Sequence, residues 1–99
     1  MIEDTEMVVG LLHIRLVIRS ARSLKDKRRV VKSLKDRIRN KFNASAAEVG
    51  SLDVHQVAEL GVAVVANDRT YVNSVLSQIS NLARGARGAE VAACDMEIL

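Results

Sequence analysis

The sequence predicts an α+β fold in which one four-stranded antiparallel sheet carries two helices on one of its faces. Four segments alternate apolar with polar or small residues at a period of two, which is typical of strands. Two further segments repeat apolar residues every three or four positions, which is typical of amphipathic helices. The 99 residues include no Pro and only five Gly, so no linker divides the chain and we expect a single domain.

The first strand is expected over residues 8–18 and the first helix from about Ser23 to Lys41. The even positions of the strand, from Val8 to Ile18, form one buried face. Ser23 is a suitable N-cap, and Asp26 places a carboxylate in the first helical turn. The predicted core face of this helix consists of Leu24, Val30, Val31, Leu34, Ile38 and Phe42.

The remaining elements follow the same reasoning. Strands are expected over residues 43–50, 58–68 and 89–99, and the first two of these can pair as a hairpin across residues 51–57. A second helix, capped by Asn67 or Asp68, ends before Gly85. Its apolar positions are Tyr71 or Val72, Val75, Leu76, Ile79, and Leu82 or Ala83.

The element order βαββαβ with right-handed crossovers predicts the ferredoxin-like arrangement. Because both helices cover the same face of the sheet, the other face stays open. On this open face we expect Val9, Leu11, His13, Arg15, Val17, Glu59, Gly61, Ala63, Val65, Val91, Ala93, Asp95 and Glu97. A face of small apolar residues and opposite charges is suited to contact a second copy of the chain, so a homodimer is one expected assembly.

No segment predicts export or membrane insertion. The apolar run MVVGLLHIRLVIR is interrupted by His13, Arg15 and Arg19, which fits neither a signal peptide nor a membrane span. Cys94 is the one cysteine and cannot form an intramolecular disulfide. These features predict a cytoplasmic protein.

The formal charge of +3 is distributed unevenly along the chain. Between Lys25 and Lys41 nine Lys and Arg accompany two Asp, whereas the rest of the chain carries six bases and ten acids. On the helical wheel, five bases form a stripe beside the core face and two more flank its N-terminal end. We predict that these seven residues bind phosphates: Lys25, Lys27, Arg28, Arg29, Lys32, Lys35 and Arg39.

The alternative interpretation is an ordinary solvated helix face. Such faces usually alternate acids and bases at i and i+4, and only Asp26 and Asp36 supply acids here, so an anionic partner is favoured. A membrane surface is less suitable because the helix lacks Trp. The only aromatic residues, Phe42 and Tyr71, are assigned to core faces, which disfavours reading of single strands by base stacking. Structured RNA recognised through its backbone remains the expected nucleic acid.

Enzymatic activity finds little support in the residues. His13 and His55 lie far apart, and no C-x-x-C, H-x-x-x-H or phosphate-loop pattern occurs, so we expect no metal and no cofactor. Arg19 or Arg22 with Asn43 offers the residue types that acylphosphatases use on the same fold. The glycine-rich loop of those enzymes is replaced by RSARSLKDK. An enzyme acting on a phosphorylated metabolite is therefore the third hypothesis.

The stretches SLKDKRRVVKSLKDRIRNKFNASAAEV and AELGVAVVANDR resemble the YlxP-like family of small bacterial proteins of undefined function, over Met7 to Leu99. The resemblance implies a ferredoxin-like fold and no defining enzymatic activity. It also implies genes that often lie near those for transcription elongation and termination, translation initiation and ribosome maturation. In many relatives the chain begins where Met7 stands, so residues 1–6 are expected to be a disordered extension and residues 7–99 the domain. The loop DVHQVA departs from the family, with His55 at a commonly aromatic position and Val57 at a basic one.

The leading prediction is a non-enzymatic, cytoplasmic RNA-binding accessory factor of ribosome assembly or translation. The alternative is a homodimeric interaction module whose basic helix binds an acidic protein partner. No membrane partner is expected.

Overall fold

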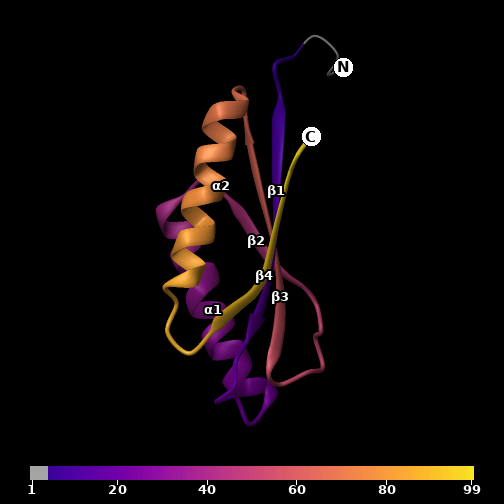
Figure 1. The fold of residues 1–99 in the computed structure, drawn as a ribbon, viewed down its shortest axis with the longest axis vertical. Coiled ribbons are helices and arrows are strands. Elements are labelled where there is room, and N and C mark those ends of the chain that lie inside the picture. The colour runs from indigo at the N-terminus through magenta and orange to yellow at the C-terminus, as the bar shows by residue number, and fades with distance from the viewer. Residues whose placement is uncertain (1–4) are drawn as a thin grey trace.

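The computed structural model describes residues 5–99 and confirms the predicted element order (Figure 1). Residues 1–4 of the expected N-terminal extension lie outside the described residues. The elements are β1 (Val8–Val17), α1 (Leu24–Lys41), β2 (Ser45–Gly50), β3 (Val57–Ala66), α2 (Arg69–Arg84) and β4 (Glu90–Ile98).

The four strands form one antiparallel sheet in the order β2-β3-β1-β4. The two central strands pair along their full length, from Val8 opposite Ala66 to Val17 opposite Val57. Both helices lie on the same side of the sheet, and the opposite side carries no helix (Figure 1). This is the ferredoxin-like arrangement that the sequence predicts.

The core lies between the sheet and the two helices, and alternation along β1 builds its floor. Leu12, Ile14 and Leu16 are 2% exposed or less, whereas Leu11 and Arg15, at odd positions of the same strand, face solvent. The helices contribute Val31, Leu34 and Ile38 from α1 and Val72, Val75, Leu76, Ile79 and Ala83 from α2. The apolar side chains that repeat every second residue in the strand and every 3.6 residues in the helices therefore pack together in one layer.

Both helices begin at side-chain caps. Ser23 Oγ accepts a hydrogen bond from the Asp26 N–H at 3.1 Å, and Asp68 Oδ2 accepts one from the Tyr71 N–H at 2.8 Å. The Asp26 carboxylate in turn accepts from the Arg22 N–H at 3.0 Å, just outside the helix. These contacts satisfy backbone donors that have no partner within the helix, so the chain leaves each loop at a defined residue.

One predicted position in the sheet is wrong by one residue, and in α2 the structure decides between two predicted alternatives. In β4 the pairing passes from Ala93 opposite Arg15 to Val91 opposite Leu16, so one residue is bulged and Val91 packs against the core instead of lying on the open face. At the start of α2, Val72 is fully buried while Tyr71 is 56% exposed. A period read along one segment cannot detect an extra residue that only the neighbouring strand reveals.

Candidate nucleic-acid interface

The solvent side of α1 presents a row of cations. It consists of Lys25, Arg28, Arg29, Lys32, Lys35 and Arg39, and we call these six residues the basic surface. Five of them are exposed and Lys35 is half-buried. From Lys25 to Arg39 the helix rises about 21 Å at 1.5 Å per residue. The row is therefore long enough to follow several consecutive phosphates of a nucleic-acid backbone.

The two acids of α1 are both engaged within the helix and its cap. Asp26 serves the N-terminus, and Asp36 accepts a hydrogen bond from Lys32 at 2.7 Å. That hydrogen bond, with the nearby charges of Lys32, Arg39 and Lys35, holds the pKa of Asp36 below its ordinary value. Asp36 stays ionised at neutral pH and offsets one positive charge, so the row keeps a large excess of cations.

Arg39 connects the basic surface to the edge of the sheet. Its guanidinium donates a hydrogen bond to the carbonyl oxygen of Ala46 in β2, an edge strand. An edge carbonyl without a partner is a site for unwanted strand pairing, and this contact covers one. Arg39 therefore has a structural contact in addition to its place on the basic surface.

Lys27 does not belong to the interface, which corrects the prediction from the sequence. Its side chain is 0% exposed and points into the protein, where Nζ donates to the carbonyl oxygens of Ser51 at 2.9 Å, Val57 at 3.2 Å and Leu52 at 3.4 Å. Glu48 Oε2 lies 2.8 Å from the same nitrogen without hydrogen-bonding alignment, so it acts as the counter-charge. An ammonium group held in this way cannot reach a phosphate.

The burial of Lys27 follows a pattern that is visible in the sequence. Residues 27, 31, 34 and 38 repeat at spacings of four, three and four, which is one helical face, and Val31, Leu34 and Ile38 are its buried members. The residue type argued against a core position because Lys is almost never fully buried without partners. The carbonyl oxygens that satisfy it belong to residues 51–57, more than 20 positions along the chain.

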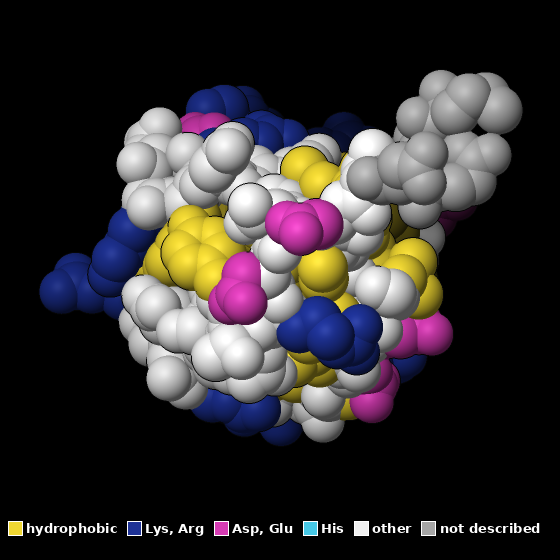
Figure 2. All heavy atoms as spheres, turned by 90° about the horizontal axis from the view of Figure 1, so that it is seen from above, with side chains coloured by type: hydrophobic (Ala, Val, Ile, Leu, Met, Phe, Trp, Pro, Cys, Tyr) yellow, Lys and Arg dark blue, Asp and Glu magenta, His cyan; other side chains and the backbone are white. Residues whose placement is uncertain are grey.

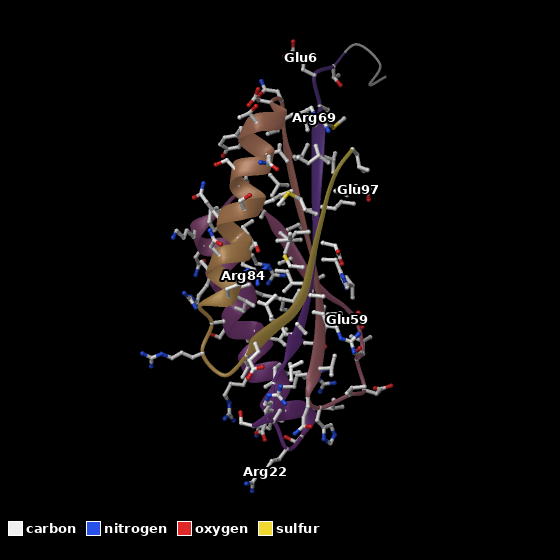
Figure 3. The ribbon with its side chains drawn as sticks, viewed as in Figure 1. Glu6, Arg22, Glu59, Arg69, Arg84 and Glu97 are labelled. Atoms are coloured by element: carbon white, nitrogen blue, oxygen red, sulfur yellow. The ribbon has the colours of Figure 1, made fainter. Side chains whose placement is uncertain are left out.

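The space-filling view shows how the charges are distributed around the molecule. In Figure 2 several Lys and Arg side chains project from the rim, including the side on which the helices lie, while acidic, hydrophobic and basic side chains lie together on the end that faces the viewer. The stick view places Glu59 and Glu97 on the side of the sheet away from the helices (Figure 3). The two faces of the molecule thus differ in charge, with the excess of cations on the helical side.

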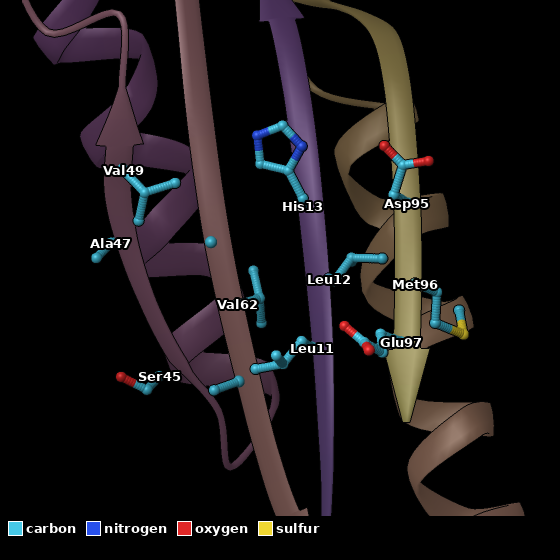
Figure 4. A pocket seen from close by; sticks show the side chains of 12 residues that line it. Leu11, Leu12, His13, Ser45, Ala47, Val49, Val62, Asp95, Met96 and Glu97 are labelled. Atoms are coloured by element: carbon cyan, nitrogen blue, oxygen red, sulfur yellow. The ribbon is translucent and has the colours of Figure 1, made fainter. Parts of the chain in front are cut away.

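The open sheet face carries a shallow hollow floored by small residues. Its lining comes from all four strands and includes Ser45 and Ala47 of β2 and Gly61 and Ala63 of β3. Larger side chains border it, among them Leu11, His13, Val49, Asp95, Met96 and Glu97 (Figure 4). The predicted composition of the open face is confirmed here apart from the shift at Val91.

Glu59 is the centre of a polar cluster on the open face. Its carboxylate accepts a hydrogen bond from Ser51 Oγ at 2.6 Å, and Oε1 lies 3.3 Å from His13 Nε2 and 3.9 Å from Arg15 Nη1. The Ser51 hydrogen bond, followed by the charges of Arg15 and His13, lowers the pKa of Glu59 below its ordinary value of 4.5. Glu59 is therefore an ionised, structurally held acid.

The depressed pKa of Glu59 predicts a contribution to stability that acid removes. A carboxyl whose folded-state pKa lies below its unfolded value stabilises the fold at pH values above the unfolded pKa, and this contribution disappears as the pH falls through the folded pKa. We expect wild type to exceed Glu59→Gln in urea midpoint at neutral pH. The difference should shrink steadily below pH 4.5. A difference that stays constant down to pH 3 would contradict the assignment.

Other residues considered from the sequence are separated in the structure. Arg19 forms an exposed ion pair with Glu90 at 3.2 Å, and His55 lies in the exposed loop after β2. Within residues 5–99 no group of three or more His, Cys, Asp and Glu side chains is arranged to hold a metal ion. In the same part of the chain, no helix combines the length and the apolar character needed to cross a membrane.

Comparisons with known proteins agree with the fold and with the sequence pattern. The sequence model of a family described as "Protein of unknown function (DUF503)" matches residues 9–96. A relative from Bacillus subtilis (strain 168), named "Uncharacterized protein YlxP", is 35% identical over 72 residues, which are 73% of this chain and 78% of the relative.

Two designed proteins of known structure share the architecture. The de novo designed protein Foldit4 aligns over 94% of this chain and 96% of its own at a TM-score of 0.56 and 16% identity. The de novo designed protein LFR1 1, described as having a ferredoxin fold, aligns over 92% of this chain and 82% of its own at a TM-score of 0.52 and 14% identity. At these identities the similarity concerns the fold alone.

Proposed function

Since the chain belongs to the DUF503 family of proteins of unknown function and is similar to YlxP of Bacillus subtilis, we propose that it is a non-enzymatic RNA-binding factor. It would contact structured RNA through the basic surface of α1. We place this activity in the cytoplasm, in ribosome assembly or translation. The resemblance to the YlxP-like family implies that the gene lies near genes for translation initiation and ribosome maturation, and this supports the assignment to ribosome assembly or translation.

The observation that carries the proposal is the excess of exposed cations on one helix whose acids are already occupied. Among the six residues of the basic surface only Lys32 forms an ion pair with an acid of residues 5–99, and that pair is an exposed i,i+4 contact worth a few tenths of a kcal/mol. Phosphates can displace such a contact at little cost. A helix stabilised only within the fold would gain nothing from leaving the other cations without counter-charges, since like charges on one helix repel.

The aromatic residues support recognition of the backbone instead of the bases. Phe42 is half-buried against the core and Lys41 Nζ lies 5.8 Å from its ring centre. Tyr71 is exposed but stands at the start of α2, outside the basic surface. Because the basic surface itself offers no stacking ring, the ligand should be recognised by the shape and charge of its phosphates, as double-helical RNA is.

The proposal is tested by reversing three cations whose side chains form no hydrogen bond or ion pair with another residue in the described part of the chain. In Lys25→Glu/Arg28→Glu/Lys35→Glu we expect the affinity for ribosomal RNA fragments and tRNA to fall by about two to three orders of magnitude at 0.1 M salt. Each lost phosphate contact should also reduce the log-log salt slope by about 0.9 on a duplex. Fluorescence anisotropy across a salt series measures both quantities.

A matched control separates the basic surface from net charge. Arg69→Glu/Arg84→Glu/Arg87→Glu changes the formal charge by the same amount but alters α2 and the loop that follows it (Figure 3). We expect this variant to lose less than tenfold. Equal losses in the two variants, or no binding of RNA by wild type at low salt, would reject the proposal. Equal affinity for a DNA duplex of the same length would reject its restriction to RNA.

A further inference from the structure

The open sheet face carries exposed apolar side chains among its charged ones, and no element of the described chain covers it. Leu11, Val49 and Val65 on it are 38%, 57% and 58% exposed, and Val9, Val17 and Val57 are half-buried. Four strands about 4.8 Å apart and up to ten residues long give this face a projected area of roughly 600 Å². Side chains increase the accessible area, which brings it close to the roughly 800 Å² per partner of a standard interface.

The relief of this face is self-complementary. Side chains of β1, namely Leu11, His13 and Arg15, project beside a hollow over β3 that is floored by Gly61 and Ala63. A Cβ at Gly61 would already lie 3.0 Å from Val49 Cγ1, so the neighbouring β2 side chain borders the hollow closely. A two-fold axis between a projecting strand and a hollowed strand places the projecting strand of each copy over the hollow of the other, so the two surfaces are complementary.

We propose that a second copy of this chain occupies the open sheet face, related by a two-fold axis that runs along the strands between β1 and β3. This is the midline of the sheet, because the strand order is β2-β3-β1-β4, so all four strands of each copy are covered. The axis places β1 of one copy over β3 of the other. Aligned packing of two sheets is a common geometry for such faces.

The strand register then identifies the residues that meet. Rotation about an axis parallel to the strands does not shift a residue along the strand direction. Each β1 residue therefore lies opposite a β3 residue of the second copy, and that β3 residue has the same number as its pairing partner within the sheet. Leu11 meets Ala63, His13 meets Gly61, and Val9 and Val17 meet Val65 and Val57. Each large side chain thus faces a small one or a valine.

The charges on the face are also compatible with this arrangement. Arg15 meets Glu59 of the second copy, and the symmetry makes this contact twice. Within one chain the two groups are 3.9 Å apart, so Arg15 is free to share the carboxylate that Ser51 holds in position. Asp95 and Glu97 meet Ala47 and Ser45 of β2 near the rim, where water remains accessible. No acid faces an acid, and no Arg faces a base.

Dimerisation and RNA binding are independent in this arrangement. Both helices lie on the side of the sheet away from the proposed contact (Figure 1). The two basic surfaces therefore remain exposed on opposite sides of the dimer. The outcome of the test below does not depend on the proposed RNA binding.

Charge reversal with rescue tests the arrangement on the full chain. By sedimentation equilibrium between 5 and 100 µM we expect wild type at about twice the chain mass of 10.8 kDa. Arg15→Glu and Glu59→Arg should each weaken the dimer by roughly 100-fold, because each places two like-charge contacts in the interface. The double variant Arg15→Glu/Glu59→Arg should recover most of the wild-type affinity.

Circular dichroism at each concentration shows that the variants remain folded, and Arg84→Glu on α2 serves as a surface control that leaves the mass unchanged. A wild-type mass of 10.8 kDa up to 100 µM would overturn the proposal. So would a dimer that neither single reversal weakens, since the contact would then lie elsewhere. A double variant no better than the single variants would overturn the proposed axis.

Discussion

Replacing Lys27 with Ala is expected to lower the free energy of unfolding by about 3–5 kcal/mol, although Lys is ordinarily a surface residue. The substitution removes a fully buried ammonium group from the carbonyl oxygens of Ser51, Leu52 and Val57. It also leaves the Glu48 carboxylate, 14% exposed, without its counter-charge. Breaking a buried ion pair on one side costs more than the pair contributes, because the remaining charge stays desolvated. Urea unfolding followed by circular dichroism measures the effect.

Paired substitutions distinguish the lost charge from the lost contacts. Lys27→Met keeps most of the side-chain volume and should destabilise the fold, and adding Glu48→Leu should recover at least about 1 kcal/mol of that loss. The recovery should be incomplete because the carbonyl oxygens of Ser51, Leu52 and Val57 still lose the hydrogen bonds from Lys27 Nζ, although Ser51 keeps one from the Val54 N–H. Lys25→Ala, two positions earlier and exposed, should change stability by less than about 0.5 kcal/mol. Equal effects at the two lysines would contradict the buried position of Lys27.

The role of Lys27 also changes how its neighbourhood should be understood. By holding the carbonyl oxygens of Ser51 and Leu52, it fixes the start of the loop between β2 and β3 against α1. Ser51 adopts a positive φ of 54°, a conformation that non-glycine residues rarely take, and its hydroxyl reaches Glu59 on the open face. One lysine therefore supports both the helix that carries the basic surface and the acid that we place in the dimer contact.

Replacing Gly10 with Val is expected to lower the free energy of unfolding by about 3 kcal/mol, which is the upper end of the usual cost of overpacking. Gly10 lies in β1 directly beneath α2. A Cβ there would lie 2.8 Å from Leu76 Cδ1 and closer still to Val72 Cγ1. Both of these side chains are fully buried and cannot swing into solvent. The helix would have to move away from the sheet, which opens voids along the rest of its buried face.

A second substitution can make room for the added carbon. Gly10→Ala in combination with Val72→Ala removes the nearest atom that the new Cβ would meet and leaves Leu76 Cδ1, so the double variant should be more stable than the sum of the two single losses predicts. Gly85→Ala is the matched glycine control, since its Cβ would meet nothing closer than 3.7 Å and its φ is −91°. Thermal and urea unfolding should place Gly85→Ala within about 0.5 kcal/mol of wild type. Additive losses in the double variant would show that close packing at Gly10 is not the cause.

The sequence predicts the fold well because its signals here are local. The helix starts are set by contacts with residues three positions away, and the structure confirms Ser23 as one cap and selects Asp68 over Asn67 as the other. The alternation of β1 and the apolar repeat of α1 identify their buried faces to within one or two residues. With two βα units and a hairpin between them, right-handed crossovers leave few arrangements other than the one observed. The family resemblance and the family match over residues 9–96 point to the same protein class.

The tertiary structure alone decided which side chains are available to act. Lys27 is buried because a distant loop supplies three carbonyl oxygens and β2 supplies Glu48, neither of which a helical wheel contains. Val91 turns to the core because β4 has one more residue than the stretch of β1 beside it. Periodicity is a property of one backbone segment and is therefore readable from the sequence. The burial of a particular charge, and the register of one strand on another, depend on groups that only folding brings together.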